Sequence, residues 1–256
     1  MRFLASFQGR RGEIVIMEDL DTGARSYYED GVFQSHAMAD GTSSFSYVHV
    51  MARLLRRCNN VLLLGCAAGS LATMLSRQGK HVTLVDDNAV SFEIARQFFN
   101  LPDEVVCVVE DFHAFLGREP TCFDGMGIDI GAASIRFDEE FDLHTCREIR
   151  ARLAPGGRIA MNMVVEHDID AVPDRILAML AADDLRGWLY DQPGEPNRNA
   201  VLSVVPEKRP CSGVLHDTGA VHVEKIEWKL RRQRLHMADL SDARRFVARQ
   251  INQQHI

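Results

Sequence analysis

Acidic side chains stand directly after two apolar runs, and they are the residues of this chain best placed to do chemistry. Asp86 and Asp87 follow the run from Val82 to Val85, and Asp129 follows Gly125 to Ile128. In open α/β sheets ligands bind at the carboxyl ends of the strands, so a carboxylate there faces the ligand crevice. Asp86 is then placed to accept hydrogen bonds from ribose hydroxyls, and Asp129 to take a proton from an amine or a hydroxyl. The alternatives are a solvated strand end at Asp86 and Asp87, and a carboxylate that caps the following loop at Asp129.

A turn of small residues lies about twenty positions before Asp86. The segment from residue 61 to residue 69 reads Val-Leu-Leu-Leu-Gly-Cys-Ala-Ala-Gly, an apolar strand that runs into a tight turn. Small residues let the backbone approach a ligand closely at the start of the following helix. The spacing Gly65-x-Ala67-x-Gly69 differs from that of dinucleotide sites, and it favours a nucleoside of the S-adenosylmethionine type over NAD. The alternative is a tight connection between a strand and a helix, with no ligand.

Apolar periodicity predicts the elements that hold these residues. Strands are expected at 61–64, 81–85, 105–109, 124–129, 157–164, 186–190 and 200–205, and helices at 69–78, 89–99, 139–153 and 170–182. Apolar strands that alternate with helices are typical of a parallel sheet buried on both faces. The sequence therefore predicts an α/β protein with a doubly wound, mostly parallel seven-stranded sheet that has an antiparallel end. Pro155-Gly156-Gly157 is expected to separate the helix that ends at 153 from the next strand.

The chain divides into three parts in this interpretation. Residues 1–48 form a small N-terminal antiparallel β segment and a linker, because the alternating stretch 13–35 contains turn signals at Asp21-Thr-Gly23 and Asp30-Gly31. Residues 49–205 form a nucleoside-binding α/β domain, with a helix expected at 44–57 where the two parts join. Residues 206–256 form a basic C-terminal extension that is partly helical.

Composition and charge limit the classes of function. With 256 residues and 46% apolar content, the chain can bury the core of one large domain. The net charge of −7 argues against a nucleic-acid-binding protein, because phosphate contact needs a basic face. The tail from Pro206 onward nevertheless carries ten Lys and Arg residues against six Asp and Glu residues. Its segment 229–236 is either a basic binding patch or the solvated face of a helix.

The sequence predicts no membrane segment, metal site or disulfide. No run approaches the roughly 18 apolar residues that a membrane helix needs, and the N-terminus turns polar too early for a signal peptide, so we expect a cytoplasmic protein. The six cysteines form no C-x-x-C pair and are expected to be reduced. No two histidines have the H-x-x-x-H spacing of a metal-binding helix.

Taken together, the motifs make the chain resemble the spermidine synthases, which are polyamine aminopropyltransferases with the Rossmann-like class I methyltransferase fold. The resemblance covers roughly residues 13 to 205. Its matching segments are Tyr28 to Ser35, Phe45 to Tyr47, Gly65 to Gly69, Glu110 with Asp111, Phe123 to Asp129 and Phe141 to Asn162. The family is commonly dimeric through its N-terminal region, so the resemblance also implies a homodimer.

The resemblance implies roles for individual residues. Asp86 stands at the ribose-binding acid, Glu110 and Asp111 match the acidic pair that closes on the adenine, and Asp129 stands at the catalytic aspartate. The implied nucleoside site consists of Gln34, Tyr47, Gly65, Ala67, Gly69, Asp86, Asp87, Glu110 and Asp111. Its ligand is S-adenosylmethionine or the decarboxylated form, bound as the donor substrate without a metal, and the second substrate is an amine-type acceptor.

The chain departs from the family where ammonium groups are bound. An aminopropyltransferase holds charged amines with carboxylates, because an unpaired charge in a closed site costs several kcal/mol. The family's aspartate in the glycine-rich turn corresponds to Ala68, and its second aspartate after the catalytic strand corresponds to Ala132. Beside the aromatic segment, a glutamine and a glutamate are replaced by Val48 and His49, and two acids by Ser43 and Ser44.

Three functions stay open on this basis. The first is a transferase that moves an aminopropyl or methyl group from an S-adenosyl nucleoside to an amine-type acceptor, with a changed substrate. The second is a genuine spermidine synthase that acts on putrescine, and the third is a non-catalytic protein that binds a nucleoside or a partner. In either enzyme, the segment from Gly131 to Glu140 is expected to form a mobile lid, in which Arg136 either meets a carboxylate or is solvated.

Overall fold

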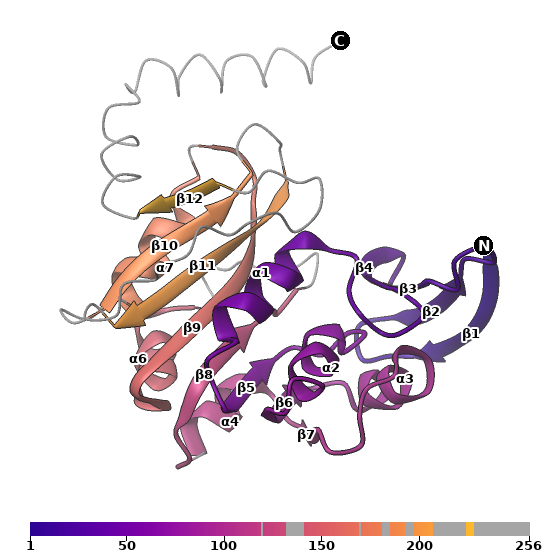
Figure 1. Ribbon diagram of the computed structural model, residues 1–256, viewed down its shortest axis with the longest axis horizontal. Coiled ribbons are helices and arrows are strands. Elements are labelled where there is room, and N and C mark those ends of the chain that lie inside the picture. The colour runs from indigo at the N-terminus through magenta and orange to yellow at the C-terminus, as the bar shows by residue number, and fades with distance from the viewer. Residues whose placement is uncertain are drawn as a thin grey trace, which may run out of the picture.

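The computed structural model describes residues 1–118, 120–131, 141–168, 170–180, 185–192, 197–206 and 224–227. In this part of the chain the strands form two sheets, and Figure 1 shows the smaller one beside the N-terminus. The larger sheet carries the helices on both of its faces.

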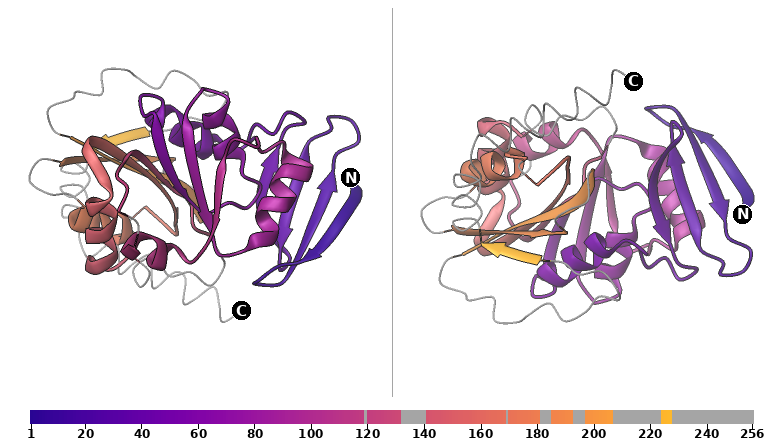
Figure 2. Two further views of the ribbon diagram at one scale, coloured as in Figure 1. Left: turned by 90° about the horizontal axis from the view of Figure 1, so that it is seen from below. Right: turned by 90° about the horizontal axis from the view of Figure 1, so that it is seen from above.

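The smaller sheet is antiparallel, as the sequence predicts. It contains β1 (Arg2–Gln8), β2 (Glu13–Glu18), β3 (Arg25–Glu29) and β4 (Val32–Ala37), in that spatial order. Ile14 and Ile16 of β2 are fully buried and pack in one cluster with Ile94 and Phe99 of α3 (Ala89–Phe99). Figure 2 shows the sheet at one end of the molecule, next to α3. The strand β1 was not predicted, because it is an edge strand whose side chains are all at least partly exposed.

The larger sheet contains all seven predicted strands and one more. Its strands are β5 (Asn60–Leu64), β6 (His81–Asp86), β7 (Val106–Val109), β8 (Phe123–Ile128), β9 (Leu153–Val165), β10 (Leu185–Asp191), β11 (Arg198–Pro206) and β12 (Glu224–Glu227). The spatial order is β12-β10-β11-β9-β8-β5-β6-β7. The strands from β9 to β7 are parallel, and β11 runs antiparallel to both β9 and β10. The mostly parallel sheet with an antiparallel end is thereby confirmed, and β12 adds an edge strand from the tail.

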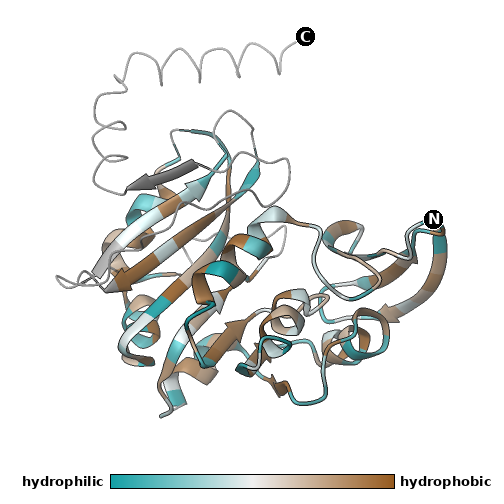
Figure 3. Cartoon of the chain, in the orientation of Figure 1, coloured by the Kyte–Doolittle hydropathy of each residue, from teal (hydrophilic) through white to brown (hydrophobic). Residues whose placement is uncertain are grey.

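Helices cover both faces of this sheet because its central strands are apolar on both sides. Leu62 and Leu64 of β5 face α4 (Phe112–Arg118), α6 (Leu143–Ala151) and α7 (Val172–Leu180). Val61 and Leu63 face α1 (Ser46–Leu55) and α2 (Ser70–Ser76), together with Phe92 of α3. Figure 3 shows the apolar character of β5 and β6 in brown. The doubly wound arrangement therefore follows from strands that are buried on each side.

The structure corrects two details of the predicted elements. The helix α4 lies between β7 and β8, where no helix was expected, and Asp111 caps its start through hydrogen bonds from the backbone N–H groups of His113 and Ala114. The strand β9 begins at Leu153, so Pro155-Gly156-Gly157 does not precede the strand. The pairing of β8 with β9 shifts between Phe123 and Gly125, and these turn residues form an irregularity within β9.

Several predicted features lie outside the described residues. They include Ala132 and the remainder of the expected lid up to Glu140, with Arg136, and the basic segment 229–236 of the tail. The division into parts at 1–48, 49–205 and 206–256 stays a prediction. Among the helices that the structure describes, none is long and apolar enough to span a membrane.

Candidate functional site

One cleft of about 1250 Å³ opens at the carboxyl ends of the parallel strands. We call it the central cleft. Its lining includes Gly65, Asp86 and Asp129 at the carboxyl ends of β5, β6 and β8, and Asn162 near the carboxyl end of β9. The strand order changes direction between β5 and β8, because β6 and β7 follow on one side and β9 on the other. A ligand crevice is expected at such a switch point, so the topology by itself selects this end of the sheet.

The predicted small-residue turn lies at this switch point. Gly65 has a φ of +96°, and a Cβ atom at this position would lie 2.2 Å from the carbonyl oxygen of Asp129. Glycine is therefore required where the ends of β5 and β8 meet. Ala67 and Gly69 also have positive φ angles, of 44° and 68°, and both line the central cleft. The turn thus brings its backbone to the cleft, as nucleoside binding would require.

The adjacent acids Asp86 and Asp87 point to different partners. The Asp86 carboxylate accepts hydrogen bonds from the backbone N–H of Cys66 at 2.8 Å and of Asn88 at 2.8 Å. Burial raises the pKa of the Asp86 carboxyl, and these two bonds oppose that effect. Both oxygens of Asp87 instead accept hydrogen bonds from the guanidinium of Arg11, at 3.2 and 3.1 Å. Arg11 lies in the turn between β1 and β2. Asp86 is thus oriented by the glycine-rich turn, whereas Asp87 ties the N-terminal sheet to the rim of the cleft.

The pair Glu110 and Asp111 lies further along the cleft, after β7. The Glu110 carboxylate accepts from the guanidinium Nε of Arg118 at 2.8 Å. Asp111 uses its Oδ1 atom to cap α4, with bonds of 3.0 and 3.1 Å. Both residues line the central cleft, and each is held in place by α4. An adenine role for the pair stays a prediction.

Asp129 lies where the cleft meets β8, and two side chains hold its carboxylate. Asn162 of β9 donates from Nδ2 to Oδ1 at 2.8 Å, and the Tyr47 hydroxyl of α1 donates to Oδ2 at 3.4 Å. The Asn162 amide also donates to Oδ1 of Asn199 at 3.0 Å, so both of its N–H groups are used. Because a carboxylate only accepts hydrogen bonds, this orientation of the amide is the one that the site requires. The carboxylate is therefore fixed in position at the edge of the cleft.

The surroundings of Asp129 favour the protonated form of its carboxyl group. Burial raises the pKa of the Asp129 carboxyl, while the bonds from Asn162 and Tyr47 lower it in part. Burial also raises the pKa of the Tyr47 hydroxyl well above its ordinary value, and the charge of Asp129 adds to this. Tyr47 therefore stays protonated as a donor, and Asp129 is the base of the pair.

The structure brings the other predicted residues to the same cleft and adds some that the sequence did not single out. Gln34 of β4 lines the cleft, and its Oε1 atom lies 3.9 Å from the position of a Cβ at Gly131. Asn162 was missed as a partner of Asp129. Its signal was a polar side chain in the buried run of β9, where it is only 7% exposed. Phe33 also lines the cleft, and the sequence did not single it out.

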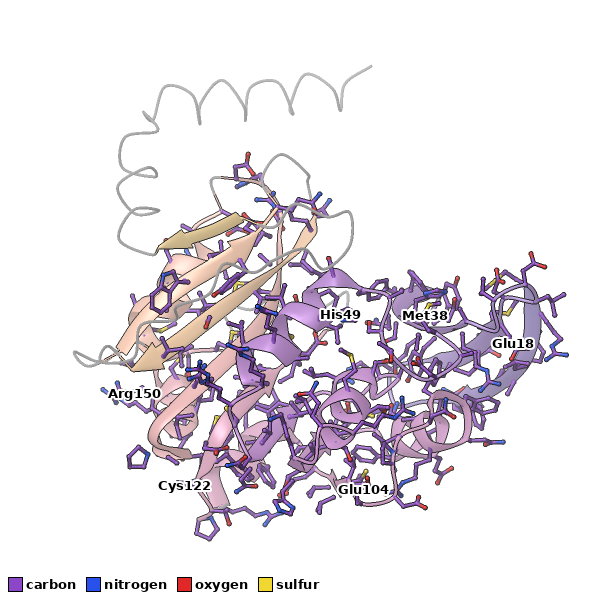
Figure 4. All side chains as sticks on the ribbon, in the orientation of Figure 1. Glu18, Met38, His49, Glu104, Cys122 and Arg150 are labelled. Atoms are coloured by element: carbon purple, nitrogen blue, oxygen red, sulfur yellow. The ribbon has the colours of Figure 1, made fainter. Side chains whose placement is uncertain are left out.

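The described residues that the resemblance places at ammonium-binding positions supply no carboxylate to the cleft. Ala68 is fully buried in the cluster beneath the N-terminal sheet. Ser43 and Val48 line the cleft with a hydroxyl and an apolar side chain. His49 of α1, labelled in Figure 4, donates from Nε2 to the Ser43 carbonyl oxygen at 2.7 Å. Ser44 contacts His36, with 2.7 Å between Oγ and Nδ1.

No protein-family model matches the sequence, and no curated protein matches it. Solved structures do match its fold. A probable spermidine synthase from Corynebacterium glutamicum aligns with a TM-score of 0.76 at 16% identity, over 92% of this chain and 94% of that chain. The chain shares the fold of the spermidine synthases. The resemblance seen in the sequence is thereby confirmed at the level of the fold.

Two further structures support this result. A spermidine synthase in complex with the transition-state analogue AdoDATO aligns with a TM-score of 0.64 at 16% identity, over 80% of this chain and 73% of that chain. The spermidine synthase from Thermotoga maritima gives a TM-score of 0.62 at 16% identity, over 80% and 72% of the two chains. At such identities the likeness establishes the fold, and the chemistry must be argued from the side chains of this chain.

Proposed function

We propose that this protein is a transferase that binds an S-adenosyl nucleoside in the central cleft and moves its alkyl group to an amine. The observation that carries the proposal is the Asp129 carboxylate, which Asn162 and Tyr47 hold beside the glycine-rich turn. The nucleoside is proposed to place its ribose at Asp86 and its adenine at Glu110 and Asp111, with Gln34 and Asp87 at the rim. No group of metal-binding side chains was found among the described residues, and the proposed step does not need one.

The chemistry follows from the position of the base. The amine nitrogen attacks the carbon next to the sulfonium sulfur, so a C–N bond forms and the C–S bond breaks. The electron pair of the broken bond goes to sulfur, which becomes a neutral thioether. The nitrogen loses a proton to Asp129, which restores its neutral form and makes it the product amine. Tyr47 and Asn162 keep the receiving oxygen in place during this transfer.

The aminopropyl and methyl versions of this reaction differ in the donor. Decarboxylated S-adenosylmethionine ends in an ammonium group, which needs a carboxylate in a closed site. The glycine-rich turn supplies none, because position 68 is a fully buried alanine. We therefore expect the decarboxylated donor to bind no more tightly than S-adenosylmethionine. Calorimetric titration with both donors and with methylthioadenosine measures this order, and a clear preference for the decarboxylated donor would support genuine spermidine synthesis.

The ribose is proposed to bind at Asp86, and Asp86→Ala tests this. The substitution is expected to weaken nucleoside binding by roughly 1.5 to 3 kcal/mol, the range for hydrogen bonds to a charged group. The matched variant is Asp87→Ala, which removes a neighbouring carboxylate that is paired with Arg11 and is expected to have a smaller effect. Calorimetry with methylthioadenosine compares the two. Equal affinity in the wild type and the Asp86 variant would remove the ribose from this position.

A further inference from the structure

We infer that the acceptor is a primary amine whose other end is apolar, an alkylamine or arylamine without a second charge, held against Phe33, Phe45 and Tyr47. We call these three residues the aromatic wall. The inference rests on the proposed function, because it concerns the second substrate of the same cleft.

The aromatic wall is continuous with Asp129. The Tyr47 hydroxyl lies 3.4 Å from Asp129 Oδ2, and the Phe45 ring stacks on the Tyr47 ring with 5.8 Å between centroids. Phe33 meets Phe45 edge to face at 5.5 Å. All three residues line the central cleft. An acceptor whose nitrogen is at Asp129 therefore has an aromatic surface beside the rest of its length.

The other cleft-lining side chains of the two segments that form the wall are uncharged. The carboxylates that adjoin the wall belong to other segments: Asp129 at Tyr47, and Glu29, which pairs with Val32 across β3 and β4. Val32, Ser43 and Val48 also line the cleft, and they come from the same two segments as the wall. Phe33 is 46% exposed and Val32 is 39% exposed, so apolar surface at this part of the cleft is still open to solvent. Covering such surface with an apolar group is favourable, and aromatic rings add a preference for a flat partner in offset or edge contact.

A second ammonium group is poorly served on this wall. It would leave water without a carboxylate partner among the six uncharged side chains named above, and that loss is large for a charge. The faces of the aromatic rings attract a cation, but this attraction is weaker than a hydrogen-bonded pair with a carboxylate. It therefore replaces only part of the hydration that the ammonium group loses. The three rings themselves therefore favour an apolar extension over a second ammonium group, and the adjoining Glu29 carboxylate already accepts from the Asn88 amide at 3.4 Å.

The competing arrangement uses the part of the cleft that follows the carboxyl end of β9. Side chains alternate along β9, so Asn162 and Val164 share the face that lines the cleft, and Glu166, the first residue after β9, lines the cleft as well. Four residues of extended chain would place Glu166 at most about 13 Å from Asn162 along the backbone. The nearby Asp170 already accepts from the backbone N–H groups of Glu166 and Val172. A diamine held by Glu166 would depend on that carboxylate and not on Phe33, so substitutions at the two residues separate the two arrangements.

The experiment measures acceptor binding to the protein saturated with methylthioadenosine, by calorimetry, with benzylamine, methylamine and 1,4-diaminobutane as probes. We expect benzylamine to bind at least about tenfold more tightly than 1,4-diaminobutane. The Phe33→Ala substitution should lower the affinity for benzylamine by about tenfold and leave the affinity for methylamine unchanged, since methylamine has no group to place on the wall. Phe3→Ala is the matched control, because Phe3 is exposed on β1 and does not line the cleft.

The remaining variant separates the two directions in which the acceptor can extend. Glu166→Gln should leave the binding of benzylamine unchanged. The inference would be overturned if 1,4-diaminobutane bound more tightly than benzylamine and Glu166→Gln abolished that binding. It would also be overturned if Phe33→Ala left the affinity for benzylamine unchanged. Turnover with each amine and both donors then tests the proposed function separately. Transfer to no amine contradicts the transferase, whereas preferred transfer to the diamine contradicts only the acceptor class.

Discussion

Replacing Asp129 by Asn is expected to lower turnover by roughly 10²- to 10⁴-fold while nucleoside affinity stays nearly unchanged. The carboxamide keeps the shape of the side chain, its oxygen can still accept from Asn162 and its NH2 group can donate to the Tyr47 hydroxyl oxygen, but it cannot take a proton. Steady-state kinetics with a saturating donor and an amine measure the loss, and calorimetry measures the affinity. In the wild type, turnover should fall as the pH drops through the raised pKa of the Asp129 carboxyl, because the base must be ionised.

Asp103→Asn is the matched control for this variant. The Asp103 side chain is fully exposed in the loop that follows α3, so the same change of group there is expected to leave turnover as in the wild type. A wild-type protein that binds nucleosides but transfers to no amine would favour the non-catalytic alternative. An Asp129→Asn variant that retains full turnover would show that another group accepts the proton.

Asp129→Asn is expected to raise the stability of the protein, although it lowers turnover. Burial raises the pKa of the Asp129 carboxyl, so the folded state binds this proton more tightly than the unfolded state. Ionisation then destabilises the fold as the pH rises from the unfolded pKa, about 3.9, through the raised folded value. Asp129→Asn should therefore unfold at a higher temperature than the wild type at pH 7. The difference should shrink as the pH falls below the unfolded pKa, where both forms are neutral.

Replacing Gly65 by Ala is expected to destabilise the protein by about 2 to 5 kcal/mol, the sum of overpacking and of a left-handed backbone at a residue with a side chain. The new Cβ would meet the Asp129 carbonyl oxygen at 2.2 Å and its carbonyl carbon at 2.9 Å. Both contacts are backbone, so the ends of β5 and β8 must separate. Nucleoside binding should be lost together with the stability. The residue after Gly65 is Cys66, whose backbone N–H orients the Asp86 carboxylate, so a shift of the turn also displaces Asp86.

Gly31→Ala separates the two causes of this loss. Gly31 also has a positive φ, of 74°, but a Cβ there would meet nothing within 4 Å. The control is expected to cost only the backbone term, about 1 to 2 kcal/mol. Urea denaturation of both variants compares them. A Gly65→Ala variant no less stable than Gly31→Ala would mean that β5 and β8 do not approach as closely as described.

Elements with strong local patterns could be predicted from the sequence. The helix α3 was expected at 89–99 and is found at Ala89–Phe99, because its apolar positions recur at helical spacing. The edge strand β1 and the short helix α4 were missed, since an exposed strand and a seven-residue helix leave little periodicity. The strand β9 begins earlier than expected, because its pairing with Phe123 continues the strand through a proline and two glycines.

The sequence by itself determined the fold class, the end of the sheet at which the central cleft opens, and the acids that stand at that end. These follow from apolar runs, turn residues and strand ends, which are local properties of the chain. Only the tertiary structure decided which of the acids Asp86 and Asp87 meets the glycine-rich turn, because neighbouring residues at a strand end point to different sides. It also decided the partners of Asp129, which come from 82 residues before it and 33 residues after it. Such contacts depend on how distant segments pack, and no local pattern contains that information.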